Sequence, residues 1–222
     1  MSFWKKATIT AVLTAMAIPL QAIPGWAEQN TFYVGDPSKR DVVSFDSDAP
    51  VELIKGTTNK IKGHVTYDKE FKFDTKHPFE IVFDVDLASI DTGIPLRNQH
   101  MRDNFLQTAK YPKAVFKARQ IKTRSKHPMK SGQVVKLTAI GDLTIHGKTV
   151  PKTIPLTVTY FPESAITKKR FKSGNMIRIR ANFPVKLAQH NIQRPEALFV
   201  KLAEEVIIKV DAFATDDKTA LK

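Results

Sequence analysis

The 222-residue sequence contains no cysteine, and this absence excludes several kinds of chemistry. A chain without cysteine has no disulfide framework, no thiolate nucleophile and no cysteine-ligated zinc or iron–sulfur site. Glycine and proline are sparse, with 9 and 13 residues, which excludes a collagen-like or low-complexity chain. Hydrophobic residues make up 42% of the sequence, which excludes a disordered chain. We therefore expect a folded protein that is stabilised by burial of its core.

Acidic residues are also few relative to basic ones. The sequence has 35 lysines and arginines against 22 aspartates and glutamates, and its formal net charge is +13 at pH 7. This charge indicates an anionic partner or surface, but it carries no information about the fold.

The first 27 residues have the layout of a secretory signal peptide. Lys5 and Lys6 form a positive start, residues 7–18 are apolar, and Gly25 and Ala27 are small residues at the cleavage position. The apolar run is shorter than the about 20 residues that span a bilayer, although an uncleaved anchor is the alternative. We expect residues 1–27 to be a signal peptide and residues 28–222 to be one domain in the bacterial periplasm or secreted.

Apolar and polar residues alternate strictly in many later segments, as in antiparallel strands with one buried face. Gly141 lies within one such segment, where a strand bends or bulges. His146-Gly147-Lys148 is typical of a tight turn. The expected strands cover residues 41–47, 60–68, 71–73, 79–87, 135–145, 156–160, 177–186 and 205–213, with another around Val115 and Phe116.

One segment has helical periodicity instead. Met101, Phe105 and Ala109 recur at every fourth position and Tyr111-Pro112 ends the pattern, which predicts a helix over residues 96–110. A second short helix is predicted over 195–202. The chain has no repeating strand–helix–strand rhythm, so a parallel nucleotide-binding sheet is not expected.

About eight antiparallel strands with one inserted α-helix predict a single all-β domain, a closed barrel or a sandwich. Closure into a barrel removes exposed strand edges. An eight-stranded barrel is wide enough to hold one small ligand, but side chains can also fill it. The alternation does not distinguish a hollow interior from a packed one.

Two stretches carry a family resemblance. Residues 87–93, Leu-Ala-Ser-Ile-Asp-Thr-Gly, are followed by Arg97, His100 and Tyr111-Pro112, and residues 141–147 read Gly-Asp-Leu-Thr-Ile-His-Gly. Together with a weaker match over 183–210, they resemble the YceI-like family of secreted, lipocalin-like polyisoprenoid-binding proteins. The resemblance covers about residues 41–213. The usual start of the family is poorly matched, because residues 45–52 lead to Gly56-Thr57-Thr58 here.

The resemblance implies a lipocalin-like antiparallel β-barrel whose apolar cavity takes an isoprenoid tail of a quinone or polyprenyl lipid. Our leading hypothesis is a carrier without catalysis, as a monomer or homodimer, with the lipid as bound ligand and no cofactor. Arg97 and His100 are candidates for a polar cavity mouth, and the alternative is that they anchor the helix. The expected cavity-lining residues, chosen by alternation in family-like strands, are Phe79, Ile81, Phe83, Val85, Phe116, Leu137, Leu143, Leu156, Val158, Ile177, Ile179 and Phe183.

The residues show no pattern of an active site or a metal site. The six histidines are far apart in sequence and no HExxH motif occurs. No G-x-S-x-G nucleophile elbow surrounds Ser89, and Asp91-Thr92-Gly93 after it is a turn signal. There is no glycine-rich phosphate loop. We therefore expect no catalytic residue and no metal.

Basic residues concentrate in two predicted hairpin tips, Lys122 to Lys130 and Lys168 to Lys172. One hypothesis is that these loops dock on an anionic membrane, and the alternative is that they are simply solvated. Nucleic acid is not expected as a partner, because the aromatic residues alternate into the apolar face. A different functional hypothesis is a secreted interaction module with a packed core, whose basic loops bind an anionic membrane, a protein or a glycan surface.

Overall fold

The computed structural model describes residues 29–68, 79–123 and 129–222. The predicted signal peptide and the predicted strand at 71–73 lie outside these residues. Within the described part, no helix is long and apolar enough to cross a membrane.

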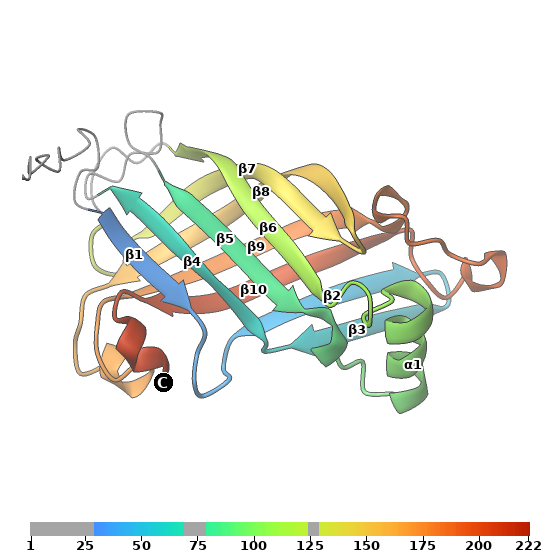
Figure 1. The fold of residues 1–222 in the computed structure, drawn as a ribbon, viewed down its shortest axis with the longest axis horizontal. Coiled ribbons are helices and arrows are strands. Elements are labelled where there is room, and N and C mark those ends of the chain that lie inside the picture. Colours follow the sequence, from blue (N-terminus) through green and yellow to red (C-terminus); the bar gives the residue numbers. More distant parts are fainter. Residues whose placement is uncertain (1–28, 69–78, 124–128) are drawn as a thin grey trace, which may run out of the picture.

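Eight antiparallel strands close into a barrel, which confirms the predicted fold class (Figure 1). Its closure comes from pairing of the first and last strands, β1 and β10. In spatial order, the barrel strands are β1 (Gln29–Val34), β4 (Ile61–Asp68), β5 (Glu80–Asp86), β6 (Lys113–Thr123), β7 (Val134–Ile145), β8 (Lys148–Phe161), β9 (Met176–Lys186) and β10 (Glu205–Thr215).

Two further strands, β2 (Val42–Ala49) and β3 (Glu52–Thr58), extend the sheet beyond β10. The two ends of β10 have different partners. Thr215 pairs with Tyr33 of β1, whereas residues 207–211 pair with β2. The connection between β1 and β2 therefore crosses β10 between Asp211 and Ala214. At this crossing the backbone N–H of Phe213 donates to the Asp41 carboxylate, 3.0 Å away.

The strand alternation places one apolar face of each strand inside the barrel. In β7, Val135, Leu137, Ala139 and Leu143 are buried, as the pattern predicts. Opposite Gly141 the pairing register shifts between Ala118 and Gln120, so the irregularity lies on β6 and not on β7, the strand that contains Gly141. A Cβ atom on Gly141 would lie 2.2 Å from the carbonyl oxygen of Lys117, so the close approach of the two strands requires glycine.

The His146-Gly147 turn between β7 and β8 is confirmed. Both residues have positive φ angles, 51° and 70°, as in the turns that match the twist of a two-residue hairpin. Strands β1 and β3 were not predicted. β8 also begins at Lys148 rather than near Leu156, because Pro151 and Pro155 are accommodated within the strand.

The predicted helix is shorter than the periodicity indicated. The α-helix α1 (Pro95–His100) continues as a π-helical turn, η2 (Met101–Phe105), and then ends. Gln107 has a positive φ of 46°, which is incompatible with a continuous helix to residue 110. The second predicted helix is only a short 3-10 turn, η5 (Glu196–Leu198).

Candidate functional site

The barrel interior is hollow, with a cavity of about 200 Å³. Every strand except β1 contributes to its lining within the described part of the chain. This is the arrangement in which inward-facing apolar side chains surround a space instead of meeting at the centre. The interior therefore differs from the packed core that the interaction-module hypothesis assumed.

The cavity wall is almost entirely apolar. Among the described residues, no charged side chain lines it, and its only polar side chains are Ser44, Thr58 and Tyr67. The hydroxyl of Thr58 lies 2.6 Å from that of Ser89 and accepts from the backbone N–H of Lys60. Burial raises the pKa of the Tyr67 hydroxyl, so this group is neutral at physiological pH. The wall can hold hydrocarbon but offers no partner for a buried charge.

All of the residues predicted to line the cavity face it except Phe79, which packs against the core instead. The lining residues that sequence reasoning missed come mainly from β2 and β3 and from the segment after β5. They include Val43, Phe45, Gly56, Leu87 and Ile90. The resemblance to a family start was weakest in β2 and β3, and neither strand alternates cleanly.

Neither Arg97 nor His100 lines the cavity. The guanidinium of Arg97 donates to Glu52 of β3 at 2.7 Å, and to the side-chain and backbone oxygens of Thr92 at 3.0 and 2.9 Å. Arg97 therefore anchors α1 to β3, which is the alternative that the sequence left open. His100 is exposed on the helix.

The family-like segment after β5 is held together by a network of polar contacts. The Asn98 side chain accepts from the backbone N–H and the hydroxyl of Thr92, and its amide donates to Asp91 at 2.7 Å. The Gly93 backbone N–H and the Asn98 amide hold the pKa of Asp91 below its usual value. The motif thus fixes the segment and does not present reactive groups.

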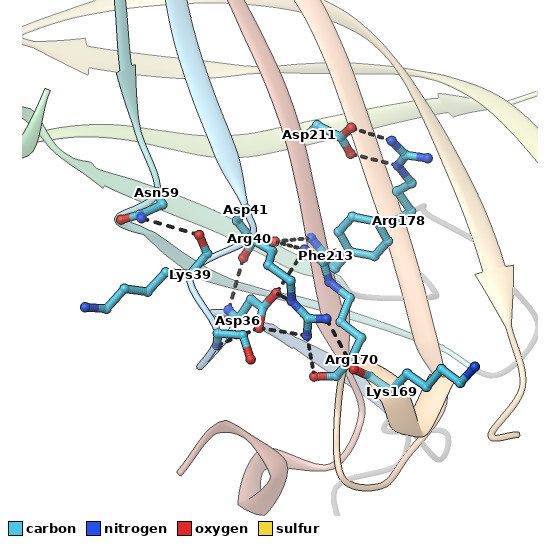
Figure 2. Close-up of polar contacts among 11 residues, drawn as sticks. Asp36, Lys39, Arg40, Asp41, Asn59, Lys169, Arg170, Arg178, Asp211 and Phe213 are labelled. Atoms are coloured by element: carbon cyan, nitrogen blue, oxygen red, sulfur yellow. Dashed lines mark hydrogen bonds and ion pairs between the residues drawn. The ribbon is translucent and has the colours of Figure 1, made fainter. Parts of the chain in front are cut away.

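The second basic segment is only partly available to an external partner. The guanidinium of Arg170 lies 3.0 Å from Asp36 and 3.1 Å from Asp41, and Figure 2 shows it among these carboxylates. Lys168 pairs with Glu163 at 2.9 Å. Lys169 and Lys172 are exposed, as are Lys122 and Lys130 of the other segment, whose residues 124–128 are not described.

The histidines of the described ranges have separate roles, and His77 and His127 fall outside those ranges. No group of three or more histidine, aspartate or glutamate side chains that could hold a metal ion occurs in the described ranges. His190 is fully buried, with its Nδ1 3.0 Å from the carbonyl oxygen of Lys148, and the carbonyl oxygen of His190 lies 3.2 Å from His146 Nδ1. Burial lowers the pKa of His190, so this residue is a neutral core histidine.

Sequence comparisons give a consistent set of relatives. The model of the YceI-like domain matches residues 33–214. Protein YceI of Escherichia coli O157:H7 is 36% identical over 91 residues, which are 40% of this chain and 43% of the relative. A UPF0312 protein of Vibrio parahaemolyticus is 32% identical over 148 residues, 65% of this chain and 69% of the relative. The match thus spans less than half the length of the first of these relatives.

Solved structures share the fold at low sequence identity. BcnA of Burkholderia cenocepacia is 24% identical with a TM-score of 0.60, over 82% of this chain and 99% of that one. A polyisoprenoid binding domain from Saccharophagus degradans, implicated in plant cell wall breakdown, is 17% identical with a TM-score of 0.61. That similarity covers 83% of this chain and 97% of the domain.

Proposed function

This chain belongs to the YceI-like family, and from that premise we propose that it is a non-enzymatic carrier of an isoprenoid lipid. The ligand is of the polyprenyl or quinone type and lies in the barrel cavity. The signal-like residues 1–27 direct the protein to the periplasm. The polyisoprenoid binding domain that shares the fold supports the choice of ligand.

The observation that carries the proposal is the apolar cavity wall, in which no described residue is charged. An isoprenoid tail exposes a large apolar area in water. Its burial contributes roughly 25 cal/mol per Å² before the costs of association. A polar ligand would instead lose hydrogen bonds to water that this wall does not replace. Among the lining residues that the structure describes, Tyr67 is the one titratable residue and burial keeps it neutral, so this part of the wall offers no pair of groups for acid–base chemistry.

Mass spectrometry of an organic extract of the purified native protein tests the proposal directly. We expect a co-purifying isoprenoid lipid, and saturable binding of an added polyprenyl alcohol to the delipidated protein. An extract without such a lipid, together with no binding of the alcohol, would overturn the proposal.

A matched pair of variants tests whether the lipid lies in the cavity. Ala181 of β9 lines the cavity, whereas the next residue, Asn182, is exposed on the outer face. Ala181→Phe places a ring in the free space and is expected to weaken polyprenyl binding at least roughly tenfold, about 1.4 kcal/mol. Asn182→Phe adds a ring outside the barrel and should leave the affinity unchanged. Titration of the delipidated variants with the polyprenyl alcohol measures both affinities, and equal affinities would contradict cavity binding.

We also propose that the exposed lysines of the two basic segments bring the barrel to an anionic membrane. Each lysine near such a surface contributes about 1 kcal/mol. Changing both Lys169 and Lys172 to glutamine is therefore expected to weaken binding to anionic vesicles by at least roughly tenfold. Vesicle co-sedimentation at low and high salt measures this effect. Sedimentation that is independent of salt and of anionic lipid content would contradict docking through charge.

A further inference from the structure

Three residues from different segments line the cavity at the end of the barrel where β2, β3 and α1 lie (Figure 1). Phe45 of β2, Gly56 of β3 and Ile90, which follows β5, all line the cavity. A Cβ atom built on Gly56 would lie 2.2 Å from Cε1 of the Phe45 ring and 2.9 Å from Cγ2 of Ile90. The ring therefore packs directly on the α-carbon of Gly56, in a space that any other residue would occupy.

Strand pairing fixes the position of the Phe45 backbone. Phe45 pairs with Gly56 on one side and with Ile208 of β10 on the other. Ile208 lines the cavity as well. The ring thus projects from a strand that is held on both edges, and only its side-chain torsions allow it to move.

Polar contacts hold the opposite side of this end in place. The hydroxyl of Ser89 lies 2.6 Å from that of Thr58 and donates to the carbonyl oxygen of Asp86 at 2.6 Å. Thr57 and Asp91 exchange two backbone hydrogen bonds of 2.8 and 2.9 Å. Because these contacts join the Ile90 segment to β3, this end of the cavity cannot retreat without breaking hydrogen bonds.

We infer that the Phe45 ring is the stop that sets how long an isoprenoid tail the cavity accepts. This inference rests on the proposed function. A tail that is too long leaves its last unit in water or must buckle, and a tail that is too short leaves an unfilled void. A phenyl ring and one isoprene unit contain nearly the same number of carbon atoms. Loss of the ring therefore frees space for about one more unit.

The test measures dissociation constants of the full-length protein for polyprenyl alcohols that differ by single isoprene units. With Phe45→Ala, the best-bound alcohol is expected to be about one unit longer than for the unchanged protein, and the longer alcohol to gain severalfold in affinity. Phe45→Leu removes fewer atoms and should shift the best-bound chain length less. It replaces Phe45→Ala in the test if that variant does not fold.

Gly56→Ala changes the contact between residue 56 and the Phe45 ring on the β3 side. Its methyl group pushes the flexible end of the Phe45 ring into the cavity, so the optimum is expected to shift to a shorter alcohol. In the double variant with Phe45→Ala this effect should largely disappear, because the ring that transmits it is absent. Independent shifts that simply add would overturn the role of the ring.

Phe161→Ala is the matched control. Phe161 packs against the separate cluster of Phe171, Met176 and Ala220 and does not line the cavity. The variant loses the same ring and should keep the chain-length optimum. If the unchanged protein binds polyprenyl alcohols and Phe45→Ala keeps the same optimum, the inference is wrong while the carrier function stands. If no alcohol binds, the carrier function fails and the inference with it.

Discussion

Replacing Arg170 with methionine is expected to lower the free energy of unfolding by about 3–5 kcal/mol. The Arg170 guanidinium bridges Asp36 and Asp41, whose side chains are only 0% and 1% exposed (Figure 2). Methionine fills much of the volume but removes the charge, so the buried Asp41 carboxylate loses its cation, whereas Asp36 keeps its ion pair with Arg40 at 2.8 Å. Urea denaturation at pH 7 measures the loss.

Arg178 is the matched control, because the guanidinium groups of Arg170 and Arg178 both lie over the Phe213 ring, at 3.4 and 5.2 Å from its centroid. Its ion pair with Asp211 is more exposed, with side chains 36% and 38% accessible. Water screens such a pair, so Arg178→Met should cost only about 0–1 kcal/mol. Equal losses for the two variants would show that the buried carboxylates do not account for the effect at Arg170.

The loss at Arg170 should also depend on pH in a defined direction. Burial already raises the pKa of Asp41 in the folded protein, although Arg170 and two backbone N–H groups oppose that effect. A carboxyl group whose pKa is higher in the folded than in the unfolded protein lowers the free energy of unfolding at pH values above the folded-state pKa. This destabilisation disappears as the pH falls from the folded-state pKa to the unfolded-state pKa, because the group becomes protonated. The difference between Arg170→Met and the unchanged protein is therefore expected to shrink on acidification. Adding Asp41→Asn should recover part of the loss at pH 7.

Phe32→Ala is expected to destabilise the barrel by about 3–5 kcal/mol, the second large effect. Phe32 is 2% exposed in β1, and its ring stacks on that of Tyr67 at 6.2 Å between centroids. β1 is short and closes the barrel through two pairs with β10, at Tyr33 and Val34. Loss of the ring leaves a void beside the strand that completes the closed sheet.

Thr31→Ala is the control for this prediction. Thr31 lies next to Phe32 on the opposite face of β1, and its hydroxyl is 2.9 Å from that of Thr66. Loss of this half-buried hydrogen bond should cost about 1 kcal/mol. Thermal and urea unfolding of both variants compare the two faces. A Phe32→Ala protein that is no less stable than Thr31→Ala would contradict the role assigned to the ring.

Much of the barrel follows from local alternation. Where apolar residues occupy every second position, as in residues 135–139 and 177–185, the strands and their inward faces are as predicted. This works because the side-chain period of a strand is two, so the pattern determines which residues share a face. The same reasoning places nearly all of the expected lining residues on the cavity.

The alternation of apolar residues does not predict the surroundings of a residue that contacts a segment distant in sequence. Arg170 lies in a basic stretch that is typical of a solvated loop, yet its partner Asp41 is 129 residues away in sequence. Asp41 is buried because β10 changes partners from β2 to β1 at that point, which leaves the Phe213 N–H to be satisfied by a side chain. Phe45 and Gly56 belong to the cavity only because β2 and β3 extend the sheet past β10.

The sequence by itself determined that this cysteine-free chain forms antiparallel strands with one apolar face, in a barrel or a sandwich. Only the tertiary structure decided that the sheet closes into a barrel, that the barrel is hollow and which residues line its cavity. The physical reason is that alternation specifies which side of a strand faces inward, but not the distance to the opposite wall. That distance depends on strand number, on the register shift opposite Gly141 and on which side chains meet across the barrel.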